Sequence, residues 1–116
     1  MSEAKTAVVY SHVAQVTLSI LIRYMSQFLG EAEAKKVARE LILVTESNLK
    51  NSPQQFPICP ELEMLGITDY RQITYKKYKV LFRLDTTPQE AHVMAFMRQK
   101  QSAQQLLIDY VIKAPT

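Results

Sequence analysis

The stretch that decides the fold is Tyr70–Asp85, which reads YRQITYKKYKVLFRLD. Every second residue from Tyr78 to Leu84 is aromatic or aliphatic, and this two-residue period is typical of a β-strand. Tyr70–Tyr75 is a second run rich in aromatic and β-branched residues, and a polar break of two lysines separates the runs. The stretch therefore predicts a β-hairpin whose tip and one face carry positive charge.

A third strand follows the hairpin. Thr86–Glu90 contains Pro88 and leads into another run of strand-forming residues, Ala91–Arg98. Three consecutive strands with short connections predict an antiparallel meander. We expect the function of the protein to lie on this sheet.

The N-terminal half predicts one strand and two helices. Thr6–Tyr10 is short and β-branched, and Ser11 directly after it is a suitable N-cap for a helix that continues to Leu29. Gly30 ends that helix, because glycine readily adopts the left-handed conformation found at helix C-termini. Glu31–Lys50 forms the second helix, and the tight turn between the two predicts an αα-hairpin.

The first helix has more apolar surface than one sheet face can cover. Leu18, Ile22 and Leu29 add apolar positions on its other sides. They predict either a deeply buried helix or a helix that binds a second protein.

The remaining segments complete a single domain that spans residues 1–116. Asn51–Gly66 contains three prolines and predicts an ordered connector, and a last amphipathic helix begins at Ser102 or Ala103 and runs to about Ile112. The order is β-α-α-β-β-β-α. It predicts an α+β, two-layer domain in which a helical hairpin packs on one face of a small antiparallel sheet.

The composition is that of a soluble globular protein, with 47% hydrophobic and 22% charged residues among 116. Cys59 is the only cysteine, so no internal disulfide can form and a reducing compartment is expected. The sequence has no apolar run long enough to span a membrane and no signal-peptide pattern at its start. We therefore expect a cytoplasmic protein that does not contact membranes.

Positive charge is concentrated in the sheet region. Residues 70–100 carry seven basic residues against two acidic ones, whereas the preceding 69 residues carry six against eight. The seven are Arg71, Lys76, Lys77, Lys79, Arg83, Arg98 and Lys100. They predict a surface that contacts a nucleic acid or an acidic protein, although exposed lysines that discourage edge pairing would give the same pattern.

Several kinds of chemistry are poorly supported. With only two glycines the chain has no phosphate-binding loop, and His12 and His92 stand without the spaced partners of a zinc site, so neither a cofactor nor a metal is expected. Cys59 lies between Ile58 and Pro60, where a small buried residue is expected rather than a nucleophile. No catalytic residue is identified. RNA cleavage without a metal would need a base, an acid and cations around the phosphate.

The run from Tyr70 to Asp85, followed by HVMAFMRQKQ, resembles the C-terminal half of RelE/ParE-superfamily toxins, which are often described as plasmid stabilisation proteins. Arg71 matches the arginine that opens one strand of these toxins, Tyr78–Arg83 matches their tyrosine-rich strand, and Met97–Gln101 matches their basic tail. The helix pair Ser11–Lys50 fits in order and length. The resemblance implies the toxin of a type II toxin–antitoxin system, which arrests growth until an antitoxin neutralises it.

The resemblance leaves two targets open. RelE-like toxins are ribosome-dependent mRNA endonucleases that need no metal, and ParE-like toxins inhibit DNA gyrase by protein contact. Arg98 stands at the position that we match to the His or Tyr of the RNA-cleaving branch. We therefore expect a ParE-like gyrase inhibitor that is not an enzyme, with an mRNA endoribonuclease or an inactive nucleic-acid-binding protein as the alternatives. The seven basic residues would contact the target, and the antitoxin would bind over Leu18, Ile22 and Leu29.

Overall fold

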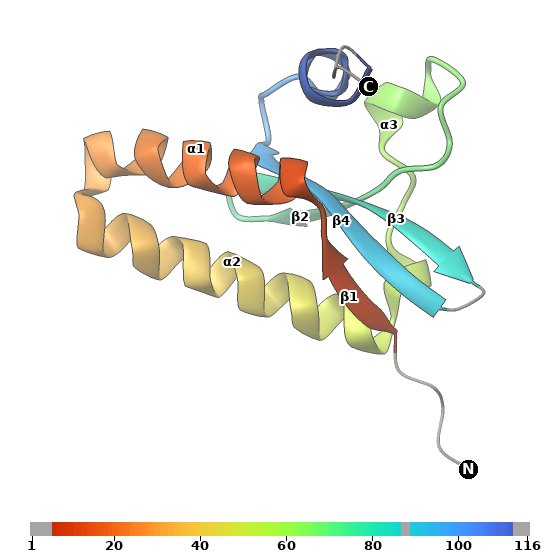
Figure 1. Cartoon of the computed structure of the whole chain (residues 1–116), viewed down its shortest axis with the longest axis horizontal. Coiled ribbons are helices and arrows are strands. Elements are labelled where there is room, and N and C mark those ends of the chain that lie inside the picture. The colour runs from red at the N-terminus through yellow and green to blue at the C-terminus, as the bar shows by residue number, and fades with distance from the viewer. Residues whose placement is uncertain (1–5, 87–88, 113–116) are drawn as a thin grey trace.

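A computed structural model describes residues 6–86 and 89–112. The elements are β1 (Ala7–Tyr10), α1 (His12–Leu29), α2 (Glu31–Asn51), the 3-10 turn η1 (Pro53–Gln55), α3 (Pro60–Glu63), β2 (Arg71–Tyr75), β3 (Tyr78–Thr86), β4 (Gln89–Arg98), α4 (Ala103–Leu107) and the π-helical segment η2 (Ile108–Ile112). The predicted α+β class and the order β-α-α-β-β-β-α are confirmed, with the short helix α3 added in the connector (Figure 1). Of the connection predicted over Thr86–Glu90, Thr86 belongs to β3 and Gln89 and Glu90 belong to β4, while residues 87–88 lie outside the described residues.

The sheet has the strand order β1-β4-β3-β2. The meander of β2, β3 and β4 is antiparallel, as predicted, but β1 pairs with β4 in parallel, with Tyr10 opposite Val93. The sheet is therefore mixed rather than wholly antiparallel. The helical hairpin lies between β1 and the meander in sequence and brings the chain back across the sheet. Because β1 and β4 are far apart in sequence, a local sequence pattern does not show whether they pair in parallel or antiparallel.

The helical hairpin covers one face of the sheet (Figure 1). The Ser11 hydroxyl accepts a hydrogen bond from the Ala14 amide at 2.9 Å and so caps α1, and Gly30 ends that helix with a φ of 84°. The main core lies between the helices and the sheet. Its largest fully buried side chains are Leu41, Leu49, Ile73, Val80, Phe82, Val93 and Phe96.

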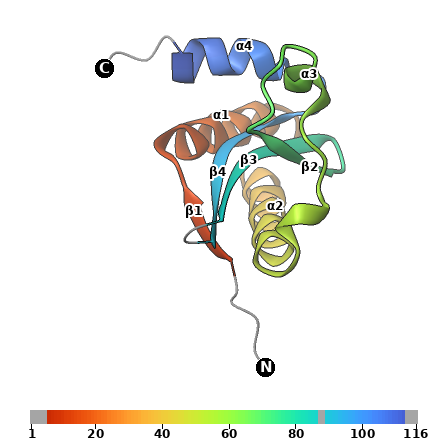
Figure 2. The ribbon, with the colours of Figure 1, turned by 90° about the vertical axis from the view of Figure 1, so that its right-hand side faces the viewer.

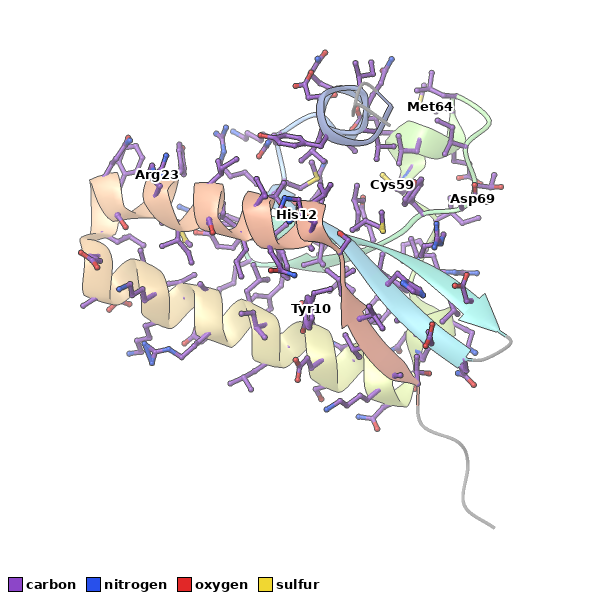
Figure 3. All side chains as sticks on the ribbon, in the orientation of Figure 1. Tyr10, His12, Arg23, Cys59, Met64 and Asp69 are labelled. Carbon is purple, nitrogen blue, oxygen red and sulfur yellow. The ribbon has the colours of Figure 1, made fainter. Side chains whose placement is uncertain are left out.

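A second core lies on the opposite face of the sheet, under α3 and α4 (Figure 2). It joins Leu81, Ala95 and Met97 of the sheet to Cys59 and Leu62 of the connector and to Ala103, Leu106 and Leu107 of α4. Figure 3 shows Cys59 beneath α3, and the prediction that it is buried is confirmed. The last helix is thus fixed to the domain and adds a partial third layer.

β4 contains a bulge, and a hydrogen bond beside it joins the sheet to α1. The pairing of β3 with β4 shifts by one residue between Leu81 and Phe82, so that Leu81 lies opposite Ala95 and Phe82 opposite Val93. Close to this point, where β1 has ended, the Phe96 amide donates to the Thr17 hydroxyl of α1 at 3.0 Å. The helix side chain thereby satisfies a buried strand amide. Within the described part of the chain, no helix combines the length and the apolar character that a membrane crossing would need.

Candidate functional site

The predicted basic residues do not share one face of the sheet. Arg71 lies opposite Phe82 and Arg98 lies opposite Tyr78, so both start on the side of the helical hairpin. Lys79 and Arg83 alternate with these positions and belong to the other side. The prediction that one sheet face collects the positive charge is therefore wrong, since the strand alternation that buries Phe82 also separates the cations.

Three of the seven cations lie away from the hairpin tip and are held by neighbouring residues of the chain. The Arg71 guanidinium donates to the Phe56 carbonyl at 2.6 Å. Lys79 is buried, with 8% of its surface exposed, and its Nζ lies 3.9 Å from Glu61 Oε1. Arg83 is half-buried, and its Nε lies 3.7 Å from Asp85 Oδ1. These contacts give the three residues structural roles.

The other four cations lie together at one end of the sheet. Lys76 and Lys77 form the turn between β2 and β3, while Arg98 and Lys100 lie at the end of β4. The Gln99 amide donates to the Lys77 carbonyl at 2.9 Å and holds the end of β4 against the turn. All four line a groove of about 870 Å³, called the basic groove below.

The opposite wall of the basic groove is apolar and comes from the helical hairpin. Its lining side chains from the helices are Tyr24, Met25, Phe28 and Leu29 of α1 and Val37 of α2. Phe28 is 71% exposed, which is unusual for a residue of its size. The Arg98 guanidinium lies 4.3 Å above the Tyr24 ring, and the Tyr24 and Phe28 rings are 5.2 Å apart. The groove thus joins cations, aromatic rings and aliphatic side chains.

The residues predicted to bind an antitoxin are divided between core and surface. Leu29 lines the basic groove and is 47% exposed, whereas Leu18 and Ile22 are half-buried and pack against the main core. The exposed apolar row on α1 consists instead of Ile20, Tyr24 and Phe28. These three residues are spaced four apart, so the helical periodicity of the sequence already indicated that they share one face of α1.

The groove contains few groups that transfer protons. Among the described residues that line it there is no carboxylate and no imidazole, and the ionisable groups are the phenols of Tyr24 and Tyr78 and the four cations. Glu40 reaches Lys76 from outside, with 3.4 Å between Oε1 and Nζ, and its negative charge raises the pKa of that ammonium group. The arrangement suits binding of a negatively charged, partly apolar surface. A smaller pocket of about 100 Å³ between α1 and α4 shares Tyr24 and Arg98 with it.

A second polar cluster was missed in the sequence. Asp85 of β3 lies opposite Glu90 of β4, and His92 follows two residues later on the same face. His92 Nε2 lies 3.1 Å from Asp85 Oδ2 and 3.1 Å from Glu90 Oε1. His92 thus has two carboxylate neighbours in the fold, although along the sequence it stands without the spaced partners of a zinc site. Asp85 becomes its neighbour through the hairpin register, which the spacing of residues along the chain does not reveal.

Comparisons with protein-family models and with curated proteins find no match. The solved structures do contain similar folds. A chain of the chromosomal ParDE TA system from P. aeruginosa superposes with a TM-score of 0.65 and 15% identity, over 83% of this chain and 98% of that one. A chain of the toxin–antitoxin complex RelBE2 from Mycobacterium tuberculosis superposes with a TM-score of 0.60 and 12% identity, over 82% and 99%.

The chain shares its fold with the matched chains of the ParDE TA system and the RelBE2 complex. The resemblance noted in the sequence is thereby confirmed for the fold. At identities of 15% and 12%, the structural similarity shows the fold alone. On this fold, the basic groove lies between the C-terminal part of α1 and the connected ends of β2, β3 and β4.

Proposed function

We propose that this chain is the toxin of a type II toxin–antitoxin system and that it acts by protein contact through the basic groove, with DNA gyrase as its target. The observation that carries the proposal is the union of four cations and an exposed apolar wall in one groove. The structural neighbours come from a ParDE TA system and a toxin–antitoxin complex, which supports the toxin role.

The composition of the groove favours a protein target over a nucleic acid. Phe28 and Leu29 expose apolar surface beside Arg98, and protein interfaces are enriched in aromatic residues and arginine around an apolar centre. A nucleic-acid groove needs cations and stacking rings but gains little from aliphatic side chains such as Leu29. The lining also lacks the carboxylate or imidazole that would most readily act as a base, among its described residues.

Ribosome-dependent cleavage of mRNA is the second candidate, and the pairing of Tyr78 with Arg98 favours it. These two residues lie directly opposite each other in the sheet, and Tyr24 lies beneath the Arg98 guanidinium. The Arg98 guanidinium could hold the scissile phosphate and the Tyr78 phenol could protonate the leaving oxygen, while Lys76, Lys77 and Lys100 bind the neighbouring backbone.

We further propose that the cognate antitoxin neutralises the toxin by covering the basic groove. The matching occupant is an acidic, amphipathic segment, whose carboxylates would meet the cations and whose apolar side chains would cover Phe28 and Leu29. Without such a partner the exposed apolar wall favours self-association. The purified chain is therefore expected to be poorly soluble alone and soluble with its antitoxin, and equal solubility in both states would contradict this role.

The experiment is induction of the chain in cells that lack the antitoxin, with growth, gyrase-linked DNA breaks and mRNA integrity as readouts. Wild type is expected to arrest growth and accumulate DNA breaks, whereas truncated mRNAs without breaks would favour the second candidate. The double variant K77E/K100E reverses two exposed cations of the groove and is expected to lose the arrest.

The matched control is R39E/K50E, which makes the same change in net charge on the exposed surface of α2 outside the groove lining. It is expected to arrest growth like wild type. An absence of any growth effect from wild type would overturn the toxin proposal, and equal toxicity of K77E/K100E and R39E/K50E would remove the groove from it.

A further inference from the structure

We propose that Asp85, Glu90 and His92 form a binding site for a first-row divalent metal ion, of which Zn²⁺ is the best match. The site lies near the end of β3 that is remote from the basic groove, since Tyr78 at the start of β3 lines the groove and Asp85 stands seven residues later. It is independent of the toxin proposal.

The sheet brings the three residues together by register. Asp85 and Glu90 are directly opposed across the antiparallel pair of β3 and β4, and Glu90 and His92 are separated by two residues on one strand. Because side chains alternate along a strand, Glu90 and His92 project from the same face. Three ligand-type side chains therefore stand on adjacent positions of two hydrogen-bonded strands, which hold them more rigidly than a loop would.

The ligand atoms have the spacing of a metal coordination shell. Both Asp85 Oδ2 and Glu90 Oε1 lie 3.1 Å from His92 Nε2, and all three atoms lie within 4.8 Å of one another. Ligands of a tetrahedral Zn²⁺ at bond lengths of about 2.0–2.2 Å are separated by roughly 3.3–3.6 Å. Small side-chain rotations would bring the present atoms to those positions.

Hydrogen bonding alone serves this geometry poorly. A ring nitrogen carries at most one proton, so Nε2 cannot give a well-directed hydrogen bond to both carboxylate oxygens. A cation placed between the three atoms would bond to each of them. The two carboxylates also bring two negative charges together, and Arg83 contacts only the other oxygen of Asp85 among the described ion pairs, with 3.7 Å between Nε and Oδ1. Asp85 Oδ2 therefore remains directed towards His92.

The donor set selects the class of metal. One imidazole nitrogen with carboxylate oxygens suits Zn²⁺ and its first-row neighbours, whereas Mg²⁺ and Ca²⁺ prefer shells made of oxygen alone. The three side chains are 24% to 43% exposed, so the ion would be reached from solvent. Three protein ligands leave a fourth position for water or for a side chain of another protein.

The test is calorimetric titration of the tag-free chain with ZnCl₂, supported by the visible absorption of bound Co²⁺. The matched pair is H92A and H12A, since His12 is the only other histidine and lies exposed at the start of α1 (Figure 3). Wild type and H12A are expected to bind one ion per chain. H92A is expected to bind about tenfold more weakly or not at all.

Two further variants keep the result interpretable. E90Q and D85N each neutralise one carboxylate and keep a side chain of the same shape, and each is expected to weaken Zn²⁺ binding. These two variants test the proposal even if H92A fails to fold. Unfolding midpoints measured without metal check the fold of each variant. An absence of saturable Zn²⁺ binding by wild type would overturn the proposal. Equal binding by wild type and H92A would also overturn it, because the ion would then be an adventitious surface cation only.

Discussion

Lys76 holds a backbone conformation that costs stability at the tip of the hairpin. Its φ of 53° lies in the left-handed region, and among the described residues it is the only one other than glycine with a positive φ. Residues in such strained conformations cluster at functional sites. Here the Lys76 side chain lines the basic groove and lies 5.3 Å above the Tyr75 ring.

Replacing Lys76 by glycine is therefore expected to separate stability from function. K76G relieves the backbone strain and should raise the free energy of unfolding by about 0.5–1 kcal/mol, while it removes a groove cation and weakens growth arrest. The control is K77G, since Lys77 has no positive φ; it should lower stability by about 0.5–1 kcal/mol. Urea unfolding and growth assays measure both effects, and a less stable K76G would show that the turn is unstrained.

Thr17 is expected to contribute strongly to the free energy of unfolding through one hydrogen bond. Its hydroxyl is the acceptor for the buried Phe96 amide at 3.0 Å, beside the bulge of β4. T17V keeps the shape of the side chain but leaves that amide without a partner, which is expected to lower the free energy of unfolding by about 1–3 kcal/mol.

The matched control for this prediction is T45V. Thr45 is equally buried, but its hydroxyl donates to Leu41 of its own helix at 2.7 Å and accepts from no strand amide. Its loss should change stability by less than about 1 kcal/mol. Thermal or urea unfolding of the two variants decides the point, and equal losses would mean that the Phe96 amide finds another acceptor.

At the scale of elements, α4 depends on a carboxylate from α3. Glu61 accepts hydrogen bonds from the amides of Ala103 and Gln104 and from the Ser102 hydroxyl, at 2.8–3.0 Å, and it lies beside the buried ammonium of Lys79. Partial burial raises the pKa of the Glu61 carboxyl, but the hydrogen bonds and the Lys79 charge outweigh it and hold the pKa below its usual value of 4.5. Glu61 thus caps the start of α4 with a full negative charge.

This lowered pKa predicts a pH dependence of stability. A carboxyl whose pKa is lower in the folded state contributes its full stabilisation above pH 4.5 and loses it as the pH falls through the folded value. E61Q is expected to be less stable than wild type by about 1 kcal/mol at pH 7, with the difference narrowing as the pH drops below 4.5. Unfolding midpoints between pH 7 and 3 measure it, with E63Q on the exposed side of α3 as control. A difference that stays constant with pH would contradict this role for Glu61.

The elements themselves were largely predictable from the sequence. The alternating residues from Tyr78 to Leu84 share one face of the sheet, as the sequence pattern indicated, and they pack against the helices. Ser11 and Gly30 cap the two ends of α1, as expected. The cap from Glu61 to α4 was not predictable, because it joins residues about 40 positions apart through packing on the second face of the sheet. Local propensity carries no record of such a contact.

The candidate site was predicted in part, for a reason seen at the scale of the whole molecule. Lys76, Lys77, Arg98 and Lys100 do meet in one groove, because the hairpin tip and the end of β4 lie at the same end of the sheet. Arg71 opens β2, whereas Lys79 and Arg83 lie within β3, and the alternation of side chains places Arg71 on one face of the sheet and the other two on the opposite face. The apolar wall was missed, since it depends on how α1 is rotated on the sheet and a helix with apolar residues on several sides does not fix that rotation.

The groove cations and the two carboxylates Asp85 and Glu90 stand at opposite ends of the sheet. At about 3.3 Å per residue, the seven steps from Tyr78 to Asp85 span roughly 23 Å. This exceeds the Debye length of about 8–10 Å at physiological salt, so an approaching partner senses each end separately.

The rate of association with an acidic antitoxin should therefore depend on the salt concentration only through the cations at the groove end of the sheet. Raising the salt concentration from about 0.05 to 0.5 M is expected to slow association of the wild-type chain markedly, because screening removes the steering by Lys77 and Lys100. K77E/K100E should associate slowly at every salt concentration, with a flat dependence. R39E/K50E changes the net charge equally but leaves the groove intact, so it should keep the slope of wild type. Stopped-flow or surface-capture kinetics measure the slopes. If both variants flatten the dependence equally, the net charge of the protein rather than the groove governs encounter.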